Sequence, residues 1–183
     1  MNIRLATAQD IKQIVSLQNS CHISNLRDCD KSDGFLNTVL GTKLLSQLIE
    51  ESSVFVAELN GDIVAMAVCG SWQFWRCSES LSTVALNLSD TNINGVAINT
   101  ENSYFWGPVC ISKLYRGKGV FEKIFEFSCT AKSGSYPYVY TYVHKDNLRS
   151  FSAHTEKADF YYTKDFYLND EIFQEMVRET RFV

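Results

Sequence analysis

The chain has 183 residues, of which 45% are hydrophobic and 21% charged, and its formal net charge of −4 gives a pI near 5.4. This length and ordinary composition predict one domain, spanning residues 1–183, with a sizeable core. The mildly acidic net charge gives no sign of a basic surface for nucleic acid or anionic lipid. No apolar run is long enough to span a membrane. We therefore expect neither nucleic acid nor a membrane as a partner.

The six cysteines include no C-x-x-C pair, and the three histidines complete no zinc pattern, so no metal site is expected. The opening Met-Asn-Ile-Arg-Leu lacks the long apolar stretch of a signal peptide. We therefore expect a cytoplasmic protein with reduced thiols, a disulfide framework being the alternative.

The first half of the chain alternates strand and helix patterns. A strand at Ile3–Ala6 precedes Thr7 and Asp10, which have the spacing of a capping box before a helix. Residues 21–34 are polar and turn-rich, which predicts a loop, and helical spacing returns over residues 35–50.

A β-hairpin comes next. Two β-rich runs, 54–59 and 62–69, flank Asn60-Gly61, which is the strongest short-range hairpin signal. Residues 71–102 contain a short helical pattern at 81–88 and an Asn-rich loop, and we interpret them as an insertion between two strands.

The second half repeats strand and helix before a final strand pair. The predicted elements are a strand at 104–111, a helix at 119–132 with Val120, Ile124, Phe125 and Phe127 on its apolar side, a strand at 138–143, a helix at 147–157, and strands on either side of Asn169-Asp170. This order predicts an α/β (α+β mixed) fold, in which helices cover the faces of a mixed sheet.

The most informative segment is the turn Tyr115-Arg-Gly-Lys-Gly-Val120, between a strand and a helix. Gly117 and Gly119 allow a tight turn in which several amide N–H groups point into one concavity. The helix adds its free N-terminal N–H groups and the positive end of its dipole, while Arg116 and Lys118 add charge. The turn is therefore typical of a pyrophosphate site, although a tight strand-to-helix turn also needs glycine.

These residues resemble the GNAT superfamily of acyl-CoA-dependent N-acyltransferases, whose motif is Arg or Gln, two residues, Gly, one residue, then Gly or Ala. The chain has Arg116 and Gly119 at the first two defined positions of this motif, but Phe121 stands at the last position, where the motif has Gly or Ala. Gly107-Pro-Val-Cys-Ile111 followed by Arg-Gly-Lys-Gly-Val-Phe resembles a subgroup with a bulky residue there. A later block, Asp146-Asn-Leu-Arg-Ser150 with Ala153-His154, also resembles the family, and the similarity covers most of the chain outside the insertion.

The resemblance implies a twisted, mostly antiparallel sheet of about seven strands, with acetyl-CoA as cofactor. Loop amides would hold the pyrophosphate, and the strand end would pair with the pantetheine arm and polarise the thioester carbonyl. The residues implied in CoA binding are Val109, Cys110, Ile111, Arg116, Gly117, Lys118, Gly119, Val120, Phe121, Asn147, Arg149 and Ser150.

The implied activity is transfer of an acetyl group to a primary amine by direct attack in a ternary complex. In many relatives a Tyr protonates the leaving thiolate; here that position holds His154, whose ordinary pKa of about 6.5 allows donation near neutral pH. A packing role for His154 is the alternative, and Tyr161 and Tyr162 are rival donors. Glu58 and Glu101 lie near strands that border such sites, but a water chain can replace a general base.

Other residues leave further alternatives open. Cys110 invites an acyl-enzyme hypothesis, although buried strand cysteines are usually inert and direct transfer needs no nucleophile. His22 and His144 are interpreted as structural.

The acceptor is expected to be a small amine, an amino acid or a peptide, bound by residues 21–36, the insertion and the final strands. Phe35, Leu36, Trp72, Phe74 and Trp75 can line an apolar cleft there, or simply fill the core. A monomer or homodimer is expected, and a catalytically silent acyl-CoA-binding module is the alternative function.

Overall fold

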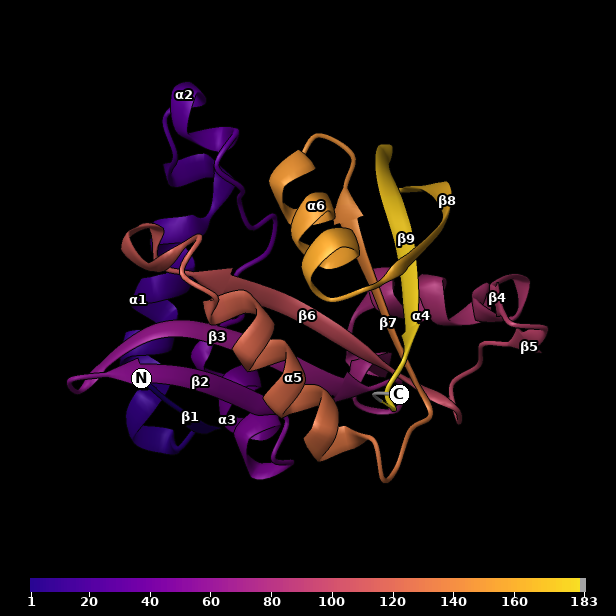
Figure 1. Ribbon diagram of the computed structural model, residues 1–183, viewed down its shortest axis with the longest axis horizontal. Helices are drawn as coiled ribbons and strands as arrows, with labels where there is room; N and C mark the ends of the chain where they lie inside the picture. Colours follow the sequence, from indigo (N-terminus) through magenta and orange to yellow (C-terminus); the bar gives the residue numbers. More distant parts are fainter. Residues whose placement is uncertain (182–183) are drawn as a thin grey trace.

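A seven-stranded sheet with helices on both faces organises residues 1–181, which the computed structural model describes (Figure 1). Its strands, in the order β1-β2-β3-β6-β7-β9-β8, are β1 Asn2–Leu5, β2 Val54–Leu59, β3 Asp62–Ser71, β6 Ser103–Ile111, β7 Tyr138–His144, β9 Glu171–Glu179 and β8 Tyr161–Leu168. Only β6 and β7 pair in parallel; the other neighbours are antiparallel. The predicted fold class is confirmed.

Six α-helices accompany this sheet within residues 1–181. They are α1 Ile11–Cys21, α2 Asp28–Lys31, α3 Thr42–Glu50, α4 Glu79–Leu86, α5 Val120–Lys132 and α6 Leu148–Lys157. Short 3₁₀ turns lie at Ala8–Asp10, Ile23–Asn25, Phe74–Cys77, Leu88–Asp90 and Lys113–Tyr115. None of the helices in this described part of the chain combines the length and apolar character that crossing a membrane requires.

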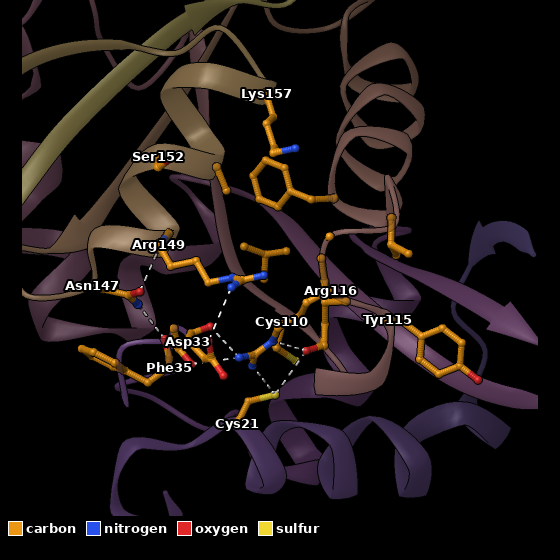
Figure 2. Close-up of a pocket in the computed structure, with 18 of the residues that line it drawn as sticks. Cys21, Asp33, Phe35, Cys110, Tyr115, Arg116, Asn147, Arg149, Ser152 and Lys157 are labelled. Atoms are coloured by element: carbon orange, nitrogen blue, oxygen red, sulfur yellow. Dashed lines mark hydrogen bonds and ion pairs between the residues drawn. The ribbon is translucent and has the colours of Figure 1, made fainter. Parts of the chain in front are cut away.

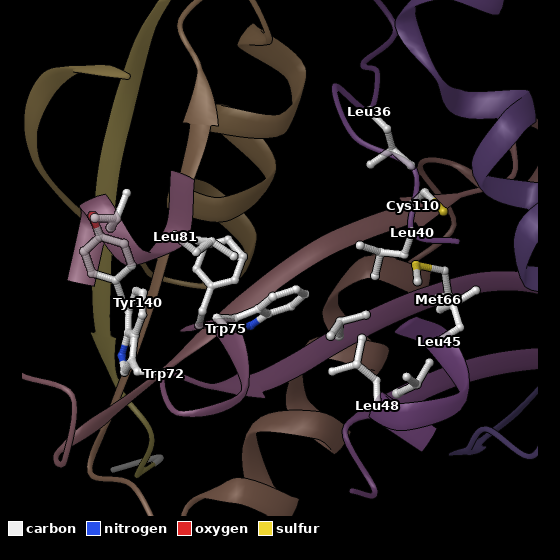
Figure 3. Close-up of a cluster of buried hydrophobic side chains, with 14 of the residues drawn as sticks. Leu36, Leu40, Leu45, Leu48, Met66, Trp72, Trp75, Leu81, Cys110 and Tyr140 are labelled. Carbon is white, nitrogen blue, oxygen red and sulfur yellow. The ribbon is translucent and has the colours of Figure 1, made fainter. Parts of the chain in front are cut away.

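The two faces of the sheet carry separate hydrophobic clusters. Helices α1 and α3 pack on one face together with the insertion, and Figure 3 shows this cluster, in which Leu45 and Leu48 meet Met66. Helix α5 covers the other face through Ile124 and Phe125. The predicted place of Phe127 on the apolar side of α5 is wrong, because its side chain is 45% exposed.

The N-terminal signals are partly confirmed. The N–H of Thr7 donates to Oδ2 of Asp10 at 2.7 Å, as the predicted capping box requires, and the Asn60-Gly61 turn joins β2 to β3. The helix predicted over residues 35–50 begins only at Thr42. The first residues of the predicted helix are extended instead, because Leu36 pairs with the end of α1 and donates its N–H to the Cys21 carbonyl at 2.8 Å.

The insertion lies between β3 and β6, as predicted, and contains α4 and a two-stranded ribbon of β4 Asn92–Ile93 and β5 Val96–Ala97. A buried carboxylate connects it to the main sheet. Oε1 of Glu175 accepts hydrogen bonds from the hydroxyls of Thr91 and Thr163, each at 2.5 Å, and Oε2 accepts one from Tyr140 at 2.7 Å. The insertion is therefore held against the sheet by polar contacts as well as by its apolar side chains.

The parallel neighbours β6 and β7 separate along their length. They pair only from Ser103 to Phe105, although β6 continues to Ile111. Just beyond this point the Trp106 carbonyl accepts a hydrogen bond from the Thr141 hydroxyl at 2.7 Å. The next two residues are unsuited to the ladder, because Gly107 has φ 148° and Pro108 has no N–H. The resulting splay leaves one edge of β6 open toward α6.

Candidate functional site

The turn between β6 and α5 presents a row of amide groups. Gly117 and Gly119 both have φ 72°, and nothing lies within 4 Å of a Cβ built on either, so their backbone conformation rather than lack of space selects glycine. Among the described residues, none accepts a hydrogen bond from the N–H groups of residues 117–122. These six consecutive donors, at the N-terminus of α5, form a site suited to an anion.

A cavity of about 330 Å³ opens beside this turn, between β6, α5, α6 and residues 33–36 (Figure 2). It brings together all the residues that the sequence predicted for CoA except Lys118 and Gly119: Val109, Cys110, Ile111, Arg116, Gly117, Val120, Phe121, Asn147, Arg149 and Ser150. We call it the loop cavity. Lys118 instead lies with its Nζ 5.4 Å from the centre of the Tyr115 ring.

The Arg116 side chain does not extend toward the amide row. Its Nε donates to the Ile111 carbonyl at 2.9 Å and one terminal nitrogen donates to the Asp33 carbonyl at 2.6 Å (Figure 2). The prediction that Arg116 adds charge to a phosphate site does not fit this geometry. Lys157 instead brings positive charge to the cavity wall, where its Nζ pairs with Glu122 at 3.1 Å.

Residues 33–36 form a wall of the loop cavity. The sequence predicted these residues on the acceptor side alone. Asn147 caps α6 by accepting the Ser150 N–H at 3.3 Å, and its Nδ2 donates to the Phe35 carbonyl at 2.8 Å. Arg149 pairs with Asp33 at 3.5 Å. The only sequence signal for this wall is Gly34, in the Asp33-Gly34-Phe35 turn.

A second cavity, of about 370 Å³, begins where the loop cavity ends. The two share five lining residues, namely Phe35, Leu36, Val109, Asn147 and Ser150. Val109 lies on the open edge of β6, just past the splay, so the two cavities meet where this strand has lost its parallel partner. We call the second one the splay cavity.

His154 lines the splay cavity but is only 1% exposed. Its Nδ1 lies 2.6 Å from the Ser150 carbonyl oxygen. Because a carbonyl oxygen can only accept a hydrogen bond, Nδ1 carries the proton. The buried Nε2 has no hydrogen-bond partner among the described residues. Burial lowers the pKa of the imidazole to about 4. The predicted imidazolium donor near neutral pH does not fit this environment.

The rival acid and base residues lie elsewhere. Tyr161 and Tyr162 are 63% and 47% exposed on β8, and neither lines the loop or splay cavity. Glu58 pairs with Arg4 at 2.7 Å, and Glu101 is exposed. The structure therefore does not bring these four predicted groups to the cavities.

Cys110 is a poor nucleophile in this setting. A hydrogen bond with the Cys21 thiol, together with burial, raises the pKa of Cys110 well above its ordinary value. The acyl-enzyme hypothesis does not fit a thiol held in its protonated form. Within residues 1–181, no group of three or more His, Cys, Asp or Glu side chains is placed to hold a metal ion.

The residues expected to form an apolar cleft divide into two groups. Phe35, Leu36 and Trp75 line the splay cavity. Trp72 fills the core, where its Nε1 donates to the Ser103 hydroxyl at 3.0 Å, and Phe74 packs against Trp75 without reaching the splay cavity.

Comparison with known proteins gives the fold a clear set of neighbours. No family model and no curated protein matches the sequence. Solved structures do match: an N-acetyltransferase from Staphylococcus aureus Mu50 (16% identity, TM-score 0.67, 98% of each chain covered) and a GNAT-family acetyltransferase from Streptococcus pneumoniae (16% identity, TM-score 0.63, 97% of this chain and 98% of the other). A third, yncA from Salmonella typhimurium, was solved with its cofactor acetyl-CoA (15% identity, TM-score 0.65, 98% and 94% covered). The chain thus has the fold of the GNAT acetyltransferases.

Proposed function

We propose that the chain is an N-acetyltransferase that binds acetyl-CoA in the loop cavity and an amine in the splay cavity. The observation that carries this proposal is the row of six unpaired N–H groups at residues 117–122, four of whose residues line the loop cavity beside the splay. Acetyltransferases with the same fold, one of them solved with acetyl-CoA, support it.

The donor set of the loop cavity fits a diphosphate. Several amide donors lie at a helix N-terminus, where the dipole favours negative charge. Arg149 and Lys157 line the same cavity, each beside a carboxylate that also lines it, Asp33 and Glu122 respectively. From there the edge of β6 at Val109 and Cys110, past the end of its pairing with β7, offers backbone groups to an extended arm, while the carbonyl of Ile111 already accepts from Arg116. When bound, acetyl-CoA would supply a thioester whose acetyl group passes to the amine nitrogen as the C–S bond breaks, with the amine's proton leaving on the thiol.

The chain contributes chiefly by positioning. Because the two cavities share Val109 and Asn147, both reactants can lie at the splay at once, and holding them together supplies much of the rate. Open N–H groups on the β6 edge are suited to stabilise charge developing on the carbonyl oxygen.

A silent acyl-CoA-binding module is the second candidate, favoured by one observation. Each acid or base named from the sequence is either outside the cavities or, like His154, buried and neutral. Steady release of CoA thiol from acetyl-CoA with a panel of primary amines, alongside calorimetric titration with CoA, separates the two. Turnover supports the enzyme, whereas binding without turnover with any amine supports the silent module. Absence of both would overturn the assignment of the loop cavity.

A further inference from the structure

The splay cavity differs from the loop cavity in charge. None of the described residues that line it is Asp, Glu, Lys or Arg, and its titratable members are Tyr142, His144 and His154. The carboxylates that approach His144, those of Asp146 and Glu171, lie 3.9 and 3.8 Å from its ring nitrogens and do not line the cavity. A second charged group on a molecule bound there would lose water without gaining a partner.

The walls of the splay cavity are largely aromatic and aliphatic. Trp75 and Leu81 reach it from the insertion, and Leu36 and Leu40 reach it from the extended segment before α3 (Figure 3). The ring of Tyr142 continues the wall, with its centre 5.3 Å from that of Phe105 and 5.2 Å from that of Phe173. Such walls favour an apolar body of the bound molecule.

We propose that the acceptor is a primary amine carried on an apolar aliphatic or aromatic body with no second charged group. This inference rests on the proposed function, because the splay cavity is taken as the acceptor site. It excludes polyamines and amino acids as preferred acceptors. The insertion is therefore a specificity element, since it supplies Trp75 and Leu81 to the wall.

Three amines of one chain length test this directly: hexylamine, 1,6-diaminohexane and 6-aminohexanoate, with 2-phenylethylamine as the aromatic member. They differ at the far end in a methyl, an ammonium or a carboxylate. We expect kcat/KM for hexylamine and 2-phenylethylamine to exceed that of both charged analogues by at least about tenfold. Equal values, or a preference for either charged analogue, would overturn the proposal.

A matched pair of variants relates the preference to the splay cavity. Ser80 and Ser82 are half-buried serines of α4, but only Ser80 lines the cavity. Ser80→Glu adds a carboxylate that attracts a second ammonium, so it should shift the ratio of kcat/KM for 1,6-diaminohexane to that for hexylamine upward about tenfold. Ser82→Glu should leave this ratio unchanged. A ratio that moves equally in both variants, or in neither, would contradict the assignment.

Calorimetry distinguishes failure of this inference from failure of the proposed function. If no amine supports turnover, 2-phenylethylamine and 1,6-diaminohexane are titrated into the wild-type protein saturated with CoA. If 2-phenylethylamine binds and 1,6-diaminohexane does not, the apolar site is supported and the proposed enzymatic function is contradicted. Binding of neither amine, or tighter binding of the diamine, would overturn the apolar site itself.

Discussion

At the scale of single residues, His154 shows how burial changes what a side chain can do. The resemblance seen in the sequence implied a proton donor at this position, and the ordinary pKa of an imidazole made His154 the candidate. In the fold the ring packs between Trp106, Phe121 and Phe160, with centroids 5.1 to 5.4 Å away. Loss of solvation in this aromatic environment favours the neutral ring, which sequence spacing alone cannot reveal.

This burial predicts a specific dependence of stability on pH. Because the pKa of His154 is about 4 in the folded protein and about 6.5 when unfolded, the unfolded chain binds more protons between these values. The free energy of unfolding should therefore fall as pH drops from 6.5 to 4, by about 3 kcal/mol from this residue.

Urea unfolding of the wild type and His154→Phe across pH 4 to 8 measures this contribution. The two curves should run parallel above pH 7, which serves as the internal control, and the wild type should lose about 3 kcal/mol more by pH 4. Identical slopes between pH 6.5 and 4 would show that the ring is charged in the folded state.

Asn147 is predicted to have two separable roles, as the cap of α6 and as a tether for residues 33–36. Asn147→Ala removes both and should lower the free energy of unfolding by about 2 kcal/mol. Asn147→Asp keeps an oxygen for the Ser150 N–H but loses the donor to the Phe35 carbonyl, so it should recover about 1 kcal/mol of that loss. Equal destabilisation of the two variants in urea would contradict the capping role.

At the scale of elements, local sequence signals were sufficient to predict structure that depends only on residues close together in the chain. The Asn60-Gly61 turn and the strand-to-helix turn at Gly119 were placed correctly, and the 81–88 helical pattern lies within two residues of α4, with Leu88 in the 3₁₀ turn that follows. The helix start at residue 35 was wrong because Leu36 pairs with Cys21, a contact between segments that periodicity cannot detect. The wall formed by residues 33–36 was missed on the cofactor side for the same reason, since its contacts to Arg116 and Asn147 are long-range.

Glu175 is one of the contacts that attach the insertion to the sheet, through its hydrogen bond from Thr91. Glu175→Ala would leave the buried hydroxyls of Thr91 and Tyr140 without their acceptor, while Thr163 would keep the Glu175 backbone carbonyl at 3.3 Å, and we expect the variant to lower the free energy of unfolding by about 3 kcal/mol. Limited proteolysis should then cut first within residues 88–97. Glu171→Ala, on the same strand but 55% exposed on its side chain, is the control and should change stability by less than about 0.5 kcal/mol. Equal effects of both variants would mean that the Glu175 network contributes nothing specific.

At the scale of the whole molecule, the splay of β6 from β7 connects the fold to the proposed chemistry. It places the loop cavity and the splay cavity next to each other, with shared walls, and four residues of the amide row (Gly117, Val120, Phe121 and Glu122) line the first. The order of strands and helices was predictable from the sequence, but the meeting of the two cavities at Val109 depends on how β6 leaves its neighbour. That depends on Gly107, Pro108 and the Thr141 hydroxyl acting together.

Calorimetric titration with CoA of the wild type, Gly119→Val and Gly134→Val tests the amide row most directly. A β-branched residue at φ 72° costs about 1–2 kcal/mol and rearranges the turn, while the open space around Gly119 lets the rest of the fold survive. Gly134 also has open space, but its φ is not positive, so its variant is the matched control. We predict that Gly119→Val weakens CoA binding by more than about tenfold with an unchanged circular dichroism spectrum, and that Gly134→Val binds like the wild type. Wild-type affinity in Gly119→Val, or no CoA binding by the wild type, would contradict the role of this turn.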